Sequence, residues 1–127
     1  MQATPLPVTL TFISICAAAL LPFTAWIGLY RGRIGVLRGD GGNPALFKRI
    51  RIHGNFVENA PLVALAMAGA ELLGLDAFWL WTGLGAFFAG RVLHYVLYDN
   101  TFRGIALLFT TLPAFAWGAW MLWRLWW

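Results

Sequence analysis

The sequence predicts an all-α integral membrane protein, a single domain over residues 1–127 that folds as an antiparallel four-helix bundle. Composition is the first reason: 61% of the residues are hydrophobic and 11% are charged, whereas a soluble domain is about half apolar and about a quarter charged. Length is the second, because the chain accommodates four apolar stretches of about 20–25 residues, each sufficient to span a bilayer. Pattern is the third, since apolar runs such as 17–21 and 64–68 lack the period-two alternation of a membrane β-barrel.

The first two predicted spans cover about residues 6–30 and 47–73. The first ends where Arg31 and Arg33 interrupt the apolar run. The loop that follows is the longest in the chain and contains a Gly-Gly-Asn-Pro cluster typical of a turn. The second span begins polar and becomes apolar, and Pro61 within it is expected to bend the helix.

The third and fourth predicted spans cover about residues 77–98 and 103–125. Three glycines in the third span, Gly83, Gly85 and Gly90, are expected to let another helix approach closely. The fourth span ends in a series of tryptophans at positions 117, 120, 123, 126 and 127. Such a series most often anchors a membrane helix at the level of the lipid headgroups.

The distribution of charge predicts the orientation. Six cations and one acid lie between Arg31 and Arg51, and Arg103 begins the fourth span on the same side. By the positive-inside rule this side is cytoplasmic and both termini are extracytoplasmic. The net charge of +4 is therefore assigned to topology and lipid headgroups, as for Lys48 and Arg33, and no motif for reading nucleic acid is present.

A polar stripe on the second span is the strongest functional signal. Arg51, Asn55, Glu58 and Asn59 lie at i, i+4, i+7 and i+8, which is one face of a helix. Glu58 is about 10 Å along the axis from Arg51, too deep in a bilayer for an ordinary surface charge. Ionisable residues at such positions are costly and usually mark a site, although Glu58 could instead pair with an arginine and lock two helices together.

The third span ends in a second stripe, formed by Arg91, His94, Tyr95 and Tyr98 at i, i+3, i+4 and i+7. Both stripes are expected to meet at the cytoplasmic end. The candidate site residues are Arg31, Arg51, His53, Asn55, Glu58, Asn59, Arg91, His94, Tyr98 and Arg103. Arginines bind carboxylates and a fixed carboxylate holds an ammonium, so this set suits a small zwitterionic ligand with more than one carboxylate.

Other chemistries fit the residues less well. The two histidines lack partners at a metal-ligand spacing, so no metal site is expected. The single cysteine, Cys16, lies in the first apolar run, where packing is its expected role. We expect His53, two residues from Arg51, to contact a loop or a lipid headgroup.

The two stripes together resemble the MAPEG family, the membrane-associated proteins in eicosanoid and glutathione metabolism. Arg51-x-His53-x-Asn55-x-x-Glu58-x-x-Pro61 is similar to the second-helix signature of that family. Arg91-x-x-His94-x-x-x-Tyr98 resembles its third-helix motif, especially in the branch of microsomal glutathione transferases and prostaglandin E synthases. Arg103 resembles the arginine that opens the fourth helix of catalytic members.

The resemblance implies a homotrimer that binds glutathione between subunits at the cytoplasmic end of the bundle. It implies that glutathione is held by Arg31, Arg51, Asn55, Glu58, Arg91, His94 and Tyr98. Arg103 is implied as the catalytic residue beside the sulfur, where a cation favours the thiolate. The other substrate would be a lipophilic electrophile or hydroperoxide arriving from the lipid bilayer, for conjugation or reduction.

The sequence departs from the branches with known products. Gly104 and Leu107 stand where the prostaglandin synthase branch has a serine and a tyrosine, and Gly54 stands where it has another arginine. Asn59 stands where the leukotriene synthase branch has a tyrosine. Two alternatives to an enzyme remain open. One is a non-catalytic lipid-binding or scaffolding member of the family, and the other is a small four-helix multidrug exporter, although the first span lacks the acid that such exporters carry.

Overall fold

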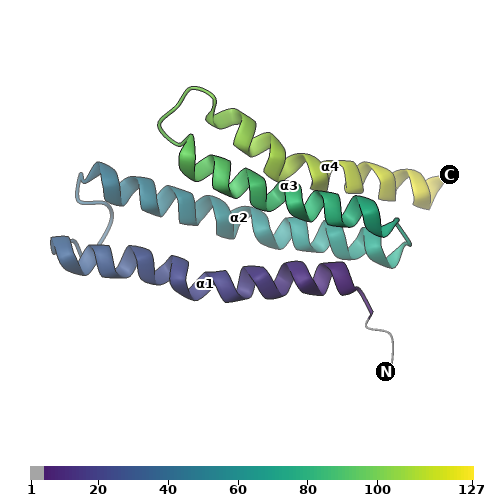
Figure 1. Ribbon diagram of the computed structural model, residues 1–127, viewed down its shortest axis with the longest axis horizontal. Helices are drawn as coiled ribbons and strands as arrows, with labels where there is room; N and C mark the ends of the chain where they lie inside the picture. Colours follow the sequence, from purple (N-terminus) through teal and green to yellow (C-terminus); the bar gives the residue numbers. More distant parts are fainter. Residues whose placement is uncertain (1–4) are drawn as a thin grey trace.

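The computed structural model describes residues 5–127, and within that range it contains four helices and no strand. They are α1 (Pro7–Ile34), α2 (Pro44–Leu72), α3 (Ala77–Val96) and α4 (Arg103–Trp126). Successive helices run antiparallel, and the α1–α2 and α3–α4 loops lie together at one end of the bundle (Figure 1). The C-terminus lies at the opposite end, beside the α2–α3 loop. The predicted all-α four-helix bundle is therefore confirmed.

Local sequence signals explain where the helices begin and end. The Asn43 side chain accepts a hydrogen bond from the backbone N–H of Leu46 at 3.0 Å and caps α2. Asp76 caps α3 in the same way, accepting from the N–H of Phe78 at 2.8 Å. α1 continues beyond Arg31 to Ile34 and is capped by Gly35, whose φ of 71° suits glycine. Arg31 therefore lies in the last turn of the helix rather than after it.

The core is made where aromatic and aliphatic side chains of all four helices meet. Phe12 on α1 packs edge-on against Phe87 on α3, with ring centroids 4.9 Å apart. Phe56 and Met67 on α2 and Trp117 on α4 belong to the same buried cluster. Most other apolar side chains face outward, as expected where the surroundings are lipid. Among the described residues, α1 and α4 are the helices long and apolar enough to cross a membrane by length and composition.

Close approach of another helix was predicted at three glycines of α3, and it is found at two of them, where α4 packs against α3. A Cβ atom added at Gly90 would lie 2.9 Å from the carbonyl oxygen of Ala106, and one at Gly83 would overlap the ring of Trp117. Gly85 has no such neighbour within 4 Å. Gly83 and Gly90 thus set the distance between the two helices.

The start of α1 is fastened to the end of α2 by a contact that the sequence reading did not predict. The Glu71 carboxylate accepts hydrogen bonds from the backbone N–H groups of Val8 at 2.9 Å and Thr9 at 2.8 Å. These N–H groups belong to the first turn of α1, where no carbonyl of the same helix can accept them. Glu71 therefore acts as a capping residue for a helix 62 residues away in sequence.

Candidate functional site

The polar stripe of α2 divides into inward-facing and outward-facing side chains. Asn55 and Asn59 are half-buried, whereas Arg51 and Glu58 are exposed in the single chain. The Asn59 amide donates to the backbone carbonyl of Asn55 at 2.7 Å, so it is occupied within its own helix. Arg51 and Glu58 therefore present opposite charges on one accessible face.

Arg91 connects three helices at the same end. Its guanidinium donates to the side-chain oxygen of Asn55 on α2 and to the hydroxyl of Thr110 on α4. Thr110 in turn donates to the carbonyl of Ala106 at 2.8 Å. The predicted convergence of the two polar stripes is present here, and Thr110 belongs to it although the sequence reading missed it. A buried threonine in an apolar helix was its only signal.

His94 is the buried centre of the candidate site. It is 8% exposed, and neither ring nitrogen has a hydrogen-bond partner within residues 5–127. The positive charges of Arg91, Arg103 and Arg51 all act on this imidazole. These arginines come from α2, α3 and α4. A buried ring with unused polar atoms in a field of positive charge is an arrangement suited to an anionic ligand.

Tyr98 extends the site toward the α3–α4 loop. Its ring stands edge-on to His94 with centroids 5.7 Å apart, and the Lys48 ammonium lies 5.3 Å from the Tyr98 centroid. Lys48 also forms an ion pair with Asp99 at 2.6 Å. Lys48 therefore has a protein partner, whereas the sequence reading assigned it to lipid headgroups.

The start of α2 is held against α1 by neighbours of the polar stripe. His53 Nε2 and the Thr24 hydroxyl form a hydrogen bond at 3.3 Å, so His53 contacts a helix rather than a loop or a headgroup. The Arg49 guanidinium lies 4.1 Å from the ring centroid of Tyr30 and donates to the carbonyl of Trp26 at 3.1 Å. These contacts position Arg51, which follows in the same turn of α2.

Three predicted site residues, Glu58, Arg103 and Arg31, form no ion pair with another residue of the described part of the chain. In the described part of the chain the one ion pair is that of Lys48 with Asp99, so Glu58 pairs with neither Arg51 nor Arg91. Within a single chain, Glu58 therefore does not connect two helices through an ion pair with an arginine, which was the alternative role considered for it. Arg103 is exposed at the start of α4. Arg31 lies at the same end of the bundle, and its side chain forms no hydrogen bond or ion pair within residues 5–127.

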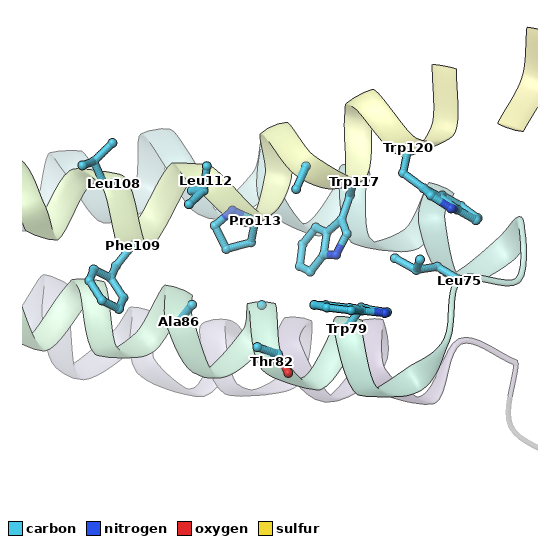
Figure 2. Close-up of a pocket in the computed structure, with 12 residues that line it drawn as sticks. Leu75, Trp79, Thr82, Ala86, Leu108, Phe109, Leu112, Pro113, Trp117 and Trp120 are labelled. Atoms are coloured by element: carbon cyan, nitrogen blue, oxygen red, sulfur yellow. The ribbon is translucent and has the colours of Figure 1, made fainter. Parts of the chain in front are cut away.

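Two apolar cavities lie beside the helices. One, of about 340 Å³, lies between α1 and α2 and includes Cys16 and Val57, the neighbour of Glu58. The other, of about 690 Å³, is a groove between α3 and α4 (Figure 2). Trp117 is buried beside this groove and belongs to the core, so it is not the headgroup anchor predicted for it. Trp123, Trp126 and Trp127 are exposed, as the anchoring role requires.

Comparison with known proteins agrees with the geometry. The model of the MAPEG family matches residues 9–123. Two curated relatives, from Escherichia coli strains K12 and CFT073, both carry the name Inner membrane protein YecN. Each is 32% identical over 88 residues, which cover 69% of this chain and 67% of the relative. No solved structure matches the chain.

Proposed function

Because the chain belongs to the MAPEG family, the membrane-associated proteins in eicosanoid and glutathione metabolism, we propose that it is a glutathione-dependent transferase or peroxidase acting on lipophilic substrates in the membrane. The observation that carries the proposal is the cluster of Arg51, Arg91 and Arg103 around His94, together with the unpaired Glu58. Glutathione has two carboxylates, one ammonium and one thiol. Arginines complement the carboxylates, and Glu58 complements the ammonium.

The exposed and the buried residues of the site have different proposed roles. Arg51 and Glu58 are exposed and bind the charged ends of glutathione, while the buried contacts of Arg91 hold Asn55 in place. His94 and Tyr98 line the pocket from α3, and Arg31 approaches it from the end of α1. Binding to these fixed charges orients the tripeptide so that its sulfur faces Arg103.

Arg103 is the proposed catalytic residue. Its positive charge stabilises the thiolate, which is the nucleophilic form of the thiol. In conjugation, the sulfur forms a bond to an electrophilic carbon as the leaving group departs or the ring opens. In reduction of a hydroperoxide, two glutathione molecules give one disulfide, one alcohol and one water. The apolar cavity beside Val57 supports a lipophilic second substrate near Glu58.

The same proposal includes assembly and location. Arg51 and Glu58 face outward from a single chain, so a site enclosed on all sides needs another copy, and a homotrimer supplies it. The name of the relatives supports an inner membrane location. The positive-inside rule supports a cytoplasmic site with both termini on the extracytoplasmic side.

Calorimetric titration of glutathione into the purified, detergent-solubilised protein tests this function. We expect wild-type protein to bind in the micromolar to millimolar range, and Arg51→Ala and Glu58→Gln to abolish the signal. Arg38→Ala is the matched control, since Arg38 is an exposed cation in the α1–α2 loop outside the cluster. Absence of heat from folded wild-type protein would count against the enzyme and in favour of another thiol or a lipid-binding role.

A non-catalytic lipid-binding scaffold is the second candidate, and the cavity between α1 and α2 favours it. Gly104 and Leu107 also favour it, because neither can supply a hydroxyl beside Arg103. The two candidates differ in turnover. With an electrophilic halonitroarene and with a lipid hydroperoxide as second substrates, an enzyme consumes glutathione and a scaffold does not.

A further inference from the structure

The tryptophan-lined end of the groove between α3 and α4 lies away from the arginine cluster and has a chemistry of its own. Figure 2 shows Trp79, Trp117 and Trp120 toward the α2–α3 loop, and Leu108 and Phe109 at the other end of the groove. The arginine cluster is at the opposite end of the bundle. The proposed glutathione site therefore does not explain this groove.

The interior of the groove suits a hydrocarbon chain. Apart from the tryptophan indoles, its one polar side chain in the described residues is Thr82, whose hydroxyl already donates to the carbonyl of Phe78 at 2.7 Å. From Leu108 to Trp120, a separation of twelve positions, α4 extends about 18 Å at about 1.5 Å per residue. One leaflet contributes about 15 Å of hydrocarbon to a bilayer, so the groove matches the length of one acyl chain.

Each of the two helices that form the groove has one charged residue about one turn beyond its tryptophans. Asp76 precedes Trp79 by three residues at the start of α3, and Arg124 follows Trp120 by four residues on α4, so each charge lies about one helical turn from an indole. Both side chains are exposed, and they form no ion pair with each other. One Asp76 oxygen caps α3, and the other has no hydrogen-bond partner among residues 5–127. Glu71, the other acid at this end, is held by α1.

We propose that this groove is a phospholipid site that selects a zwitterionic headgroup with a primary ammonium, such as phosphatidylethanolamine. One acyl chain lies between α3 and α4, and the indoles lie at the level of the headgroup, where tryptophan is favoured. Arg124 binds the phosphate and Asp76 accepts hydrogen bonds from the ammonium. A trimethylated ammonium cannot donate such bonds. The site is independent of the proposed glutathione chemistry.

Native mass spectrometry tests the site on the intact protein. The protein is incubated in detergent with equal amounts of phosphatidylethanolamine, phosphatidylcholine and phosphatidylglycerol that share the same acyl chains. We expect phosphatidylethanolamine to be retained about fivefold over the other two, as one hydrogen bond to a charged group at an exposed site would give. Equal retention of all three lipids by wild-type protein would overturn the proposal.

Three variants separate the parts of the site. Asp76→Asn keeps the helix cap and is expected to bring the retained ratio of phosphatidylethanolamine to phosphatidylcholine close to one. Arg124→Gln is expected to lower retention of every phospholipid. Ala116→Phe fills the groove and is expected to abolish retention, whereas Ala119→Phe, at an exposed position of α4 outside the groove, leaves it unchanged.

Two results with these variants would contradict the proposal. An unchanged lipid ratio in Asp76→Asn would remove the role of the carboxylate. A change of oligomeric state in Ala116→Phe, seen in the same spectra and absent from Ala119→Phe, would identify the groove as an interface between copies of the chain. Folding of each variant is checked by its helical circular dichroism.

Discussion

Arg91 on α3 donates a hydrogen bond to the side-chain oxygen of Asn55 on α2. Both residues are predicted ligand residues, yet the structure commits them to each other, and Arg91 also reaches Thr110 on α4. The guanidinium is therefore a connection between helices as well as a positive charge. Arg51 has no such partner in the described residues and keeps its charge available.

This difference predicts that two substitutions in the polar stripe of α2 affect different properties, one the stability of the fold and the other the binding of glutathione. Asn55→Ala leaves a half-buried guanidinium nitrogen without its acceptor and should lower stability by about 1–2 kcal/mol. Arg51→Ala removes an exposed side chain and should change stability by less than about 0.5 kcal/mol, while it abolishes glutathione binding. Thermal unfolding in detergent measures both. If Arg51→Ala were the more destabilising of the two, the assignment of roles would be wrong.

The four-helix bundle could be predicted because composition, span length and loop length depend on local sequence. For the contact between Asn55 and Arg91, the sequence predicted that the two polar stripes meet but not that these two side chains form a hydrogen bond. The identity of its third member could not, because Thr110 is one of several threonines in apolar helices and only packing distinguishes it. The trimer stays a prediction, since a single chain carries no contact with another copy.

Gly90 should be the least replaceable glycine of α3. A Cβ there would lie 2.9 Å from the Ala106 carbonyl oxygen and 2.6 Å from the Thr110 hydroxyl, and the backbone oxygen cannot move away without separating the helices. We expect Gly90→Ala to cost about 1–3 kcal/mol and to weaken glutathione binding by disturbing the Arg91–Thr110 contact. Denaturant unfolding and calorimetry measure the two effects.

Gly85→Ala is the control for that substitution, because nothing lies within 4 Å of its added Cβ. Alanine favours helix over glycine by about 1 kcal/mol, so this variant should be as stable as wild type or more stable. Equal losses from Gly85→Ala and Gly90→Ala would mean that close approach of α4 does not decide the effect.

Glu71 should contribute to stability, although it lies outside both polar stripes. Replacing it by glutamine removes the charge and one of the two oxygens that accept from Val8 and Thr9. We expect a loss of about 1–3 kcal/mol, the cost of leaving a buried N–H group without its acceptor. Glu58→Gln, at an exposed acid on the same helix, should leave unfolding nearly unchanged. Hydrogen exchange of the first turn of α1 should rise in Glu71→Gln alone.

The contact of Glu71 with the first turn of α1 could not be predicted from the sequence. The capping residue and the capped turn are 62 residues apart, so neither helix periodicity nor a local capping motif indicates them. The sequence places Glu71 at the end of a predicted span, where an acid is ordinary. Only the antiparallel arrangement of α1 and α2 brings the carboxylate to the exposed N–H groups.

Arg103→Ala is expected to separate chemistry from binding. Arg103 is exposed at the first position of α4 and makes no ion pair in the described residues, so its loss should barely change stability. Its charge acts on His94 beside the proposed position of the sulfur. Without it, less of the bound thiol is thiolate at neutral pH, and kcat should fall about 10–100-fold, the equivalent of about 1.4–2.8 kcal/mol in the barrier. Glutathione affinity should change less than threefold.

Arg103→Lys, which keeps the charge, should recover part of the rate. Arg33→Ala, at a cation outside the cluster, should leave both rate and affinity unchanged. Stopped-flow measurement of thiolate absorbance separates this role from a structural one. If Arg103→Ala weakened binding as much as Arg51→Ala and left the thiolate signal intact, Arg103 would be a binding residue and the thiolate would be stabilised elsewhere.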